Sequence, residues 1–348
     1  MPSKHEKQSL RLKASRKAKQ DEFYTCLEDI EKELKYYRHH FKDKVVLCNC
    51  DDPYVSKFFH YFSFNFEFLK IKELLTTCYK SNDIHLFTQN RDQRAMSLKY
   101  DGFNHNNRVP HPDEIGVELL KEDGDFRSDE CIELLKRADI VSTNPPFSLF
   151  REYLRQLITY EKKFVIIGNI NAVAYKEIFP LLKENKVWLG PSIRGGDRRF
   201  GVPDDYVLRS KLCEVDENGQ KFIRVNGVRW FTNLEFPQRY ENLPLYRRYN
   251  PDDYPHYDNY NAINVNKVNE IPVDYEGAMG VPITFFDKYN PKQFEILGIT
   301  SQQDTSGLRT KIYGPQDVAN YSTLNSRGAL RNGNALKSLY ARILIRRR

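Results

Sequence analysis

The chain has 348 residues, a length that suits one large domain or a catalytic domain with an appendage. Its hydrophobic fraction of 40% is enough for a core, and no apolar run is long enough to span a bilayer. Six cysteines, without paired C-x-x-C motifs or clustered histidines, argue against a disulfide framework and against a metal site. The basic N-terminus lacks the apolar stretch of a secretory signal, so we expect a cytoplasmic protein with no membrane partner.

The net charge of +7 is unevenly distributed along the chain. Residues 1–20 carry seven lysines and arginines with one glutamate, and residues 305–348 carry nine with one aspartate. The two ends therefore have net charges of +6 and +8, which leaves −7 for residues 21–304. Basic ends are often only solvated, but they can also follow a phosphate backbone, and this second interpretation predicts a polyanionic partner.

The first part of the chain alternates between helix and strand patterns. Residues 28–41 place Ile30, Leu34 and Tyr37 on one face of a predicted helix. Residues 44–53 open with an apolar run and end at a proline, which predicts a strand. The next predicted elements are a helix at 55–69, a strand at 74–79, a polar and irregular insertion at 88–118, and a helix at 128–137.

One short stretch combines a strand pattern with an abrupt end. Ile140 and Val141 are β-branched and suit a buried strand. Pro145 and Pro146 cannot donate to a sheet ladder, so the strand must end there. Asn144 is therefore held at the carboxyl end of a strand, which is where ligands bind in open α/β sheets.

The residues at this strand end suit chemistry on an exocyclic amino group. The side-chain oxygen of Asn144 and the carbonyl of Pro145 are two acceptors, and Pro146 has no N–H that would compete for them. Two acceptors that hold both amine hydrogens favour a pyramidal nitrogen, with its lone pair aimed at an electrophile. Phe147 offers a stacking face for a base, worth about 1–3 kcal/mol. The simpler alternative is a Pro-Pro turn with Phe147 in the core.

The alternation of strand and helix continues after this motif. A helix is predicted at 148–160, a continuous apolar strand at 163–168, a helix at 172–183 and a strand at 186–190. A continuous apolar strand is typical of a parallel sheet that is covered on both faces. Because strand and helix alternate from 44 to 190, the predicted fold class is α/β with a doubly wound sheet.

The remaining residues depart from this alternation. Residues 191–206 carry several arginines and two adjacent glycines, which predicts a basic loop. A hairpin over an Asn-Gly turn is predicted at 212–225, followed by a strand at 228–234. Beyond residue 237 the composition shifts toward Tyr, Asn, Asp and Pro, with short strands predicted at 271–300 and an edge strand at 341–346.

The tetrapeptide 144–147 matches the catalytic motif of amino methyltransferases that use S-adenosylmethionine. The longer string 139–153 resembles the EcoRI-type adenine-specific DNA methyltransferases, and the resemblance extends from about residue 19 to about residue 297, more loosely to the end. It implies a Rossmann-like class I methyltransferase sheet with a C-terminal target-recognition region. It also implies methyl transfer to N6 of an adenine flipped out of double-stranded DNA, within a restriction-modification system and without a metal. The catalytic residues are then Asn144, Pro145, Pro146 and Phe147.

The resemblance also implies a cofactor site made of several short segments. Without the resemblance, each of these segments could equally be an ordinary helix start or a strand-to-loop turn. The segment 21–25 holds the methionine end of the cofactor, and the turn after the first strand receives polar groups, although it lacks the usual glycines. In the Gly-Asp-Phe motif at 124–126, the Asp accepts a hydrogen bond from the amino group of the cofactor's adenine, and the Phe packs on that adenine ring. The ribose partner stays open, because Cys-Tyr-Lys at 78–80 replaces the usual acid. The implied cofactor residues are Phe23, Tyr24, Thr25, Asn49, Cys50, Asp51, Asp52, Pro53, Asp125, Phe126 and Asn144.

The resemblance also divides the chain by role. A basic arm at 1–20 precedes a methyltransferase domain at 21–235, and 236–348 recognises the DNA target and contacts phosphate. Trp230 or Phe231 could enclose the flipped adenine, or could simply be core residues. We expect a monomer, which can act twice on a palindromic site. The residues expected to contact DNA are Lys13, Arg16, Lys17, Lys19, Arg194, Arg198 and Arg199.

Several alternatives stay open at this point. The same motif serves RNA adenine methyltransferases, and protein glutamine methyltransferases tend to have Tyr where this chain has Phe147. A DNA-binding protein with an inactive catalytic fold would not bind S-adenosylmethionine. A nuclease would need magnesium ligands of the kind at 112–113 and 184–186, but such short patterns arise by chance.

Overall fold

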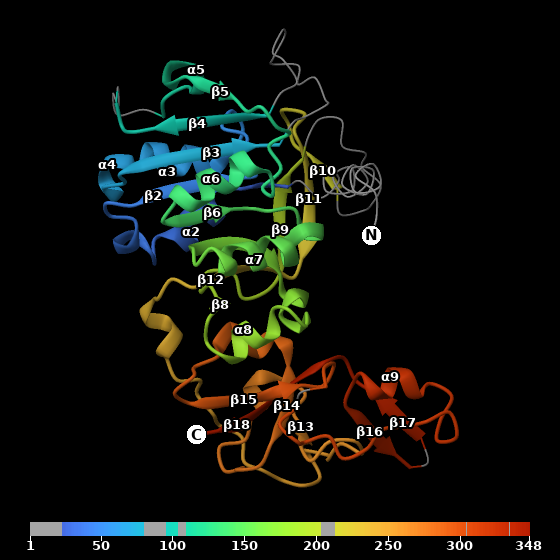
Figure 1. Cartoon of the computed structure of the whole chain (residues 1–348). Helices are drawn as coiled ribbons and strands as arrows, with labels where there is room; N and C mark the ends of the chain where they lie inside the picture. Colours follow the sequence, from blue (N-terminus) through green and yellow to red (C-terminus); the bar gives the residue numbers. More distant parts are fainter. Residues whose placement is uncertain (1–22, 80–94, 104–108, 203–212, 304, 334) are drawn as a thin grey trace. The chain divides into compact units, whose positions relative to one another are not determined.

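The computed structural model describes residues 23–79, 95–103, 109–202, 213–303, 305–333 and 335–348 (Figure 1). The chain divides into two compact units. The first comprises Met1–Asn169 and Gly195–Leu234, and the second comprises Ile170–Arg194 and Glu235–Arg348. Among the helices described, none is long and apolar enough to cross a membrane.

The first unit holds the greater number of strands. Its described elements, in chain order, are β1 (Tyr24–Thr25), α2 (Leu27–Leu34), η1 (Arg38–His40), β2 (Val45–Asn49), α3 (Lys57–Phe64), α4 (Phe66–Leu69), β3 (Glu73–Cys78), β4 (Met96–Tyr100), α5 (Pro112–Ile115), β5 (Val117–Leu119), α6 (Asp129–Arg137), β6 (Ile140–Thr143), η2 (Phe147–Leu149), α7 (Phe150–Thr159), β7 (Lys163–Asn169), β9 (Asp197–Gly201), β10 (Cys213–Val215), β11 (Lys221–Asn226) and β12 (Val228–Thr232).

A large sheet forms the core of this unit, with its strands side by side in the order β5-β4-β3-β2-β6-β7-β12 (Figure 1). Strand β2 pairs in parallel with β3 and β6, and β6 pairs in parallel with β7. The outer strands β4, β5 and β12 run antiparallel to their neighbours. Every residue of β2, β3 and β6 is buried, as expected for strands covered on both faces. The mixed α/β class predicted from the sequence is confirmed.

Helices pack on this sheet, and their first turns fix the loops at the strand ends. Helix α3 packs against β3, α6 against β2, and α7 against β7. The side chain of Ser56 caps α3 by accepting from the amides of Phe58 and Phe59, and Ser128 caps α6 by accepting from Cys131. Both caps stand close in sequence to predicted site residues, so helix capping helps to fix those residues.

A second, four-stranded sheet of the first unit has the order β1-β9-β11-β10. Strand β9 pairs antiparallel with β1 and β11, and Thr25 stands opposite Phe200. This sheet brings the start of the described chain together with residues some 175 positions later, so the short β1 is held by a long-range contact.

The second unit contains two further sheets. Its elements are η3 (Ile170–Ala174), α8 (Phe179–Lys183), β8 (Trp188–Leu189), η4 (Pro237–Tyr240), β13 (Ile263–Asn264), η5 (Val268–Glu270), β14 (Met279–Pro282), η6 (Ile283–Lys288), β15 (Phe294–Ile299), α9 (Tyr321–Asn325), β16 (Ala329–Asn332), β17 (Ala335–Ser338) and β18 (Arg342–Arg347). One sheet has the order β13-β14-β18-β15, and β16 and β17 form a two-stranded sheet of their own.

Four sequence predictions about these elements are wrong. Strand β18 is not an edge strand, because β14 and β15 flank it on both sides. The basic loop predicted at 191–206 contains strand β9, and the irregular insertion at 88–118 contains β4, α5 and β5. The helix predicted at 172–183 is broken into η3 and α8.

Candidate active site

Asn144 stands directly after β6, as the sequence predicts, and its carboxamide is held in one orientation. The Nδ2 atom donates to the backbone carbonyl of Phe23, 2.6 Å away. The Oδ1 atom is buried and has no hydrogen-bond partner among the described residues. A buried acceptor without a partner is costly in a folded protein, so this oxygen is suited to receive a donor from a ligand.

The residue whose carbonyl accepts from Asn144, Phe23, belongs to a cluster of three aromatic rings. Phe23 and Phe147 meet edge to face with centroids 5.7 Å apart, and Phe200 lies 5.8 Å from Phe23 and 6.5 Å from Phe147. Phe200 is placed there by the pairing of β9 with β1. The half-buried ring of Phe147 belongs to this cluster, so the residues beside Asn144 can form the walls of a site for a flat ring.

The carboxyl of Asp51, after β2, is buried beside β6. Its oxygens accept from the hydroxyls of Thr143 and Ser56, the latter at 2.9 Å. Burial raises the pKa of this carboxyl to about 7, although the hydrogen bonds from Thr143 and Ser56 act in the opposite direction. The Thr143 hydroxyl also lies within hydrogen-bond distance of the Asn49 carbonyl. One hydroxyl hydrogen cannot serve two acceptors fully, so the Asn49 carbonyl and the Asp51 carboxyl compete for the Thr143 hydroxyl.

A second chain of contacts joins β2 to the predicted adenine-binding segment. The hydroxyl of Tyr153, on α7, donates to Oδ1 of Asn49. The ring of Tyr153 meets the ring of Phe126 edge to face at 5.1 Å, and the Phe126 carbonyl accepts from Gln156 at 2.9 Å. Asn49 is therefore a residue that positions α7 and Phe126, in addition to any contact with a ligand.

Asp125 is fixed by an ion pair that the sequence analysis did not anticipate. Its carboxylate accepts from the Arg127 side chain at 2.6 and 2.8 Å, and Arg127 also donates to Glu152 at 2.7 Å. The preceding Gly124 has a φ of +73°, and a Cβ there would lie 2.3 Å from the carbonyl oxygen of Cys78. Glycine thus lets this loop rest on the end of β3, next to β2.

The other predicted cofactor residues lie in β1 and in the turn after β2. Thr25 is buried and its Oγ1 has no hydrogen-bond partner among the described residues, while Tyr24 is half-buried. Cys50 leaves β2 with a φ of +64°, Asp52 accepts from the amide of Tyr54, and Pro53 is buried. The described cysteines form no disulfide with one another.

The residues predicted to contact DNA are distributed differently. Lys13, Arg16, Lys17 and Lys19 lie outside the described residues. Arg198 and Arg199 are on β9, where the Arg199 guanidinium stacks on Phe222 at 3.5 Å and lies 3.6 Å from Glu214. That guanidinium is engaged within its own sheet, so it is less available for phosphate than a loop residue would be.

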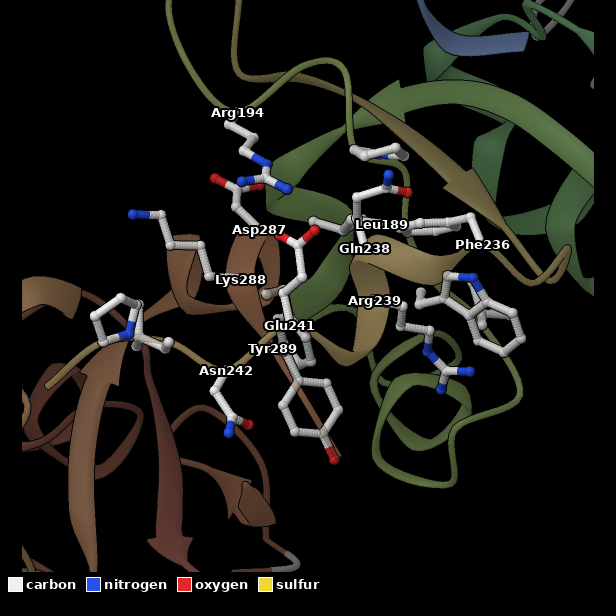
Figure 2. A pocket seen from close by; sticks show the side chains of 16 residues that line it. Leu189, Arg194, Phe236, Gln238, Arg239, Glu241, Asn242, Asp287, Lys288 and Tyr289 are labelled. Atoms are coloured by element: carbon white, nitrogen blue, oxygen red, sulfur yellow. The ribbon is translucent and has the colours of Figure 1, made fainter. Parts of the chain in front are cut away.

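Arg194 belongs to the second unit and lines a pocket there. Figure 2 shows the side chains of Arg194, Asp287, Glu241 and Lys288 among those that line this pocket. Apolar residues such as Leu189 line the other side. Acidic and basic groups are mixed on this wall, so Arg194 does not stand in a uniformly positive surface.

Two further predictions can be compared with the structure. Trp230 and Phe231 are both fully buried, and their rings pack against Phe58 and Phe150 at 6.0 and 4.9 Å. They are core residues in this arrangement.

The residues named for a nuclease are engaged in local contacts. The carboxylate of Asp113 accepts from the hydroxyl of Tyr54 at 2.6 Å, and Glu184 pairs with Lys186 at 2.7 Å. These contacts are those of ordinary surface residues, so they give no support to the nuclease alternative.

Sequence reasoning missed four residues that shape the site: Phe200, Thr143, Tyr153 and Arg127. Thr143 and Tyr153 lie within the string that carries the family resemblance, so their position was a signal that could have been used. Phe200 could have been found only by pairing β9 with β1, which no local pattern indicates.

Comparison with known proteins gives a consistent result. A family model described as "Adenine-specific methyltransferase EcoRI" matches residues 11–348. The chain is 50% identical over 299 residues to the Type II methyltransferase M.EcoRI of Escherichia coli, with 85% of this chain and 91% of that protein covered. It is 37% and 36% identical to the Type II methyltransferases M.MpnI of Mycoplasma pneumoniae and M.MgeORF184P of Mycoplasma genitalium, with 96% of this chain and 97% of each relative covered. No solved structure matches the chain.

Proposed function

Because the chain belongs to the family of EcoRI adenine-specific methyltransferases, we propose that it transfers a methyl group from S-adenosylmethionine to N6 of adenine at one short sequence in double-stranded DNA. Relatives named Type II methyltransferases support a role in a restriction-modification system. A target base inside a duplex cannot reach the cofactor, so the adenine is flipped out of the helix.

The observation that carries this proposal is the buried Oδ1 of Asn144 beside three aromatic rings. Asn144 accepts one hydrogen of the adenine amino group, and the carbonyl of Pro145 accepts the other. The base stacks on Phe147. Because Nδ2 is already bound to the Phe23 carbonyl, the carboxamide cannot turn its donor toward the amine. The protein thus contributes alignment of the amine, which is a large part of catalysis in such a reaction.

Polar groups at the neighbouring strand ends fit S-adenosylmethionine. This cofactor, when bound, supplies an electrophilic methyl group on a sulfonium. The ionised Asp51 carboxylate suits its ammonium, and the Oγ1 of Thr25, which has no hydrogen-bond partner among the described residues, suits a second polar group of the methionine end. Phe126 is packed as a wall beside Asp125, which retains lone pairs for an adenine amino group despite its contact with Arg127.

The finer fold assignment is part of the same proposal. A parallel centre of β3, β2, β6 and β7, with connecting helices, is the arrangement expected of a Rossmann-like class I methyltransferase. We assign cofactor binding and catalysis to 21–235, target recognition to 236–348 and phosphate contact to the basic arm 1–20. The protein is expected to act on DNA as a monomer.

The experiment uses labelled methyl donor, purified protein and unmethylated genomic DNA, followed by nucleoside analysis and mapping of the modified positions. We expect label in N6-methyladenine within one short motif. Label that appears in RNA or protein while DNA stays unlabelled would overturn the choice of substrate.

A substitution tests the role of the carboxamide. Asn144→Ala removes the oriented acceptor, so we expect turnover to fall on the order of 100-fold or more, by analogy with the loss of other oriented polar groups in active sites. Cofactor binding, measured by calorimetry, should stay nearly unchanged. Turnover close to that of the wild type would show that Asn144 does not hold the amine.

A further inference from the structure

The β16–β17 ribbon, residues 329–332 and 335–338, is a small antiparallel sheet of the second unit. Its register pairs Leu330 with Lys337 and Asn332 with Ala335. Its strands pair with each other and with no third strand among the described residues. A two-stranded ribbon of this kind is one of the few protein elements that fit into the major groove of B-form DNA.

The two faces of the ribbon differ. Alternate residues of a strand and their directly opposed partners share a face, so Ala329 and Leu336 point one way, and both pack in a cluster with Tyr313 and Leu324. The opposite face carries Leu330, which packs on another core cluster near the base of the ribbon. That second face also presents Lys337, opposite Leu330, and the pair Asn332 and Ala335, and all three are exposed.

Contacts at its base hold the ribbon firmly. The carboxylate of Asp258 accepts from Arg331 at 2.8 and 3.0 Å and from the Tyr313 hydroxyl at 2.7 Å. The amide of Asp258 donates to the Ala329 carbonyl at 2.8 Å, and the Ala329 amide donates to Asn259 at 2.8 Å. An element that recognises base pairs needs such support, because side chains on a flexible backbone discriminate poorly between sequences.

The charge and chemistry of this segment point to nucleic acid. Residues 305–348 carry a net +8, within a chain whose central part is acidic. An Asn side chain can contact both N6 and N7 of adenine, and Lys can reach a phosphate or a guanine. Ala335 opposite Asn332 is small, so a base edge can come close to the strand and a thymine methyl group can rest on it.

We propose that the β16–β17 ribbon enters the major groove of the target duplex, where Asn332 and Ala335 contact base edges and Lys337 contacts a phosphate. This inference rests on the proposed function and assigns sequence recognition to a specific element. It predicts two separable effects, because base contacts determine specificity while phosphate contacts contribute a salt-dependent affinity.

The test compares Asn332→Ala and Lys337→Ala with two exposed controls in the same unit, Asn320→Ala and Lys267→Ala. For each purified protein, kcat/KM is measured on the cognate duplex and on all duplexes with one base pair changed, at several salt concentrations. Asn332→Ala should lower cognate kcat/KM by roughly 10- to 100-fold and reduce discrimination at one adenine-containing position. Lys337→Ala should leave discrimination intact and reduce the salt slope of binding by about 1.

Both controls should stay within about twofold of the wild type, and S-adenosylmethionine binding should be unchanged in all variants. Wild-type discrimination and salt slope in Asn332→Ala and Lys337→Ala would overturn the proposal. A wild-type protein that places no label in DNA would instead refute the proposed function, so the two failures are distinguishable.

Discussion

The protonation of Asp51 is a property of a single residue that can be measured. Burial raises its pKa from 3.8 to about 7, so the folded protein binds a proton that the unfolded chain releases between these values. The free energy of unfolding should therefore fall as pH rises from about 4 through about 7, by up to a few kcal/mol, since one pKa unit is worth about 1.4 kcal/mol. Asp51→Asn should remove this slope. Urea denaturation at a series of pH values measures it.

The matched control is Asp252→Asn, which changes an exposed carboxylate. It should retain the wild-type slope.

A second consequence concerns the ligand, because ionised Asp51 attracts an ammonium group more strongly than the neutral acid. Binding of S-adenosylmethionine should tighten through pH 7 in the wild type and not in Asp51→Asn. Parallel pH profiles for these two proteins would mean that Asp51 does not titrate in this range.

Strand β18 is the element on which the largest sheet of the second unit depends. Leu344 is fully buried and lies opposite Gly280 of β14 and Gly298 of β15. Leu344→Ala should destabilise the protein by about 2–5 kcal/mol, because it leaves a cavity in a core strand. Leu119→Ala, on the edge strand β5 and 49% exposed, should cost much less. Equal midpoints of chemical denaturation for the two variants would argue against a central role for β18.

The error about β18 has a physical cause. Its sequence is Arg-Ile-Leu-Ile-Arg-Arg, and the flanking arginines favour an exposed edge. The three apolar residues are nevertheless consecutive and all buried, which is the pattern of a strand covered on both faces. Strand β9 was missed for a different reason, since its arginines are polar and its partners β1 and β11 are not adjacent in sequence. Local patterns carry no information about such pairing.

Strands β2, β6 and β7 of the parallel centre could be predicted, because each contains a run of β-branched apolar residues and a break follows it. Asn144 and Asp51 could be named from their positions after β6 and β2 and from the family resemblance. The bond between Asn144 and the Phe23 carbonyl could not, because 121 residues separate them and a backbone carbonyl has no sequence signature. The orientation of the carboxamide is thus a product of the whole fold.

For the whole molecule, the uneven charge suggests how the protein holds DNA. The arm 1–20 has a net +6, while residues 21–304 have a net −7 and must approach a polyanion with the help of the ends. Each phosphate contact contributes about 0.9 to the slope of log K against log salt. If Lys13, Arg16, Lys17 and Lys19 contact phosphates, deletion of 2–20 should reduce that slope by about 3 to 4. Fluorescence anisotropy with a cognate duplex at several salt concentrations measures it.

A shorter deletion, 2–10, provides the control, because it removes Lys4 and Lys7 but keeps those four cations. It should leave the slope close to that of the wild type. At low salt the longer deletion should still methylate DNA, because the cofactor and catalytic residues lie after the arm. If both deletions show the wild-type slope, the arm is only solvated, and the +8 of residues 305–348 must supply the attraction for phosphate. The acidic residues 21–304 would then be held on DNA by the basic residues 305–348 alone.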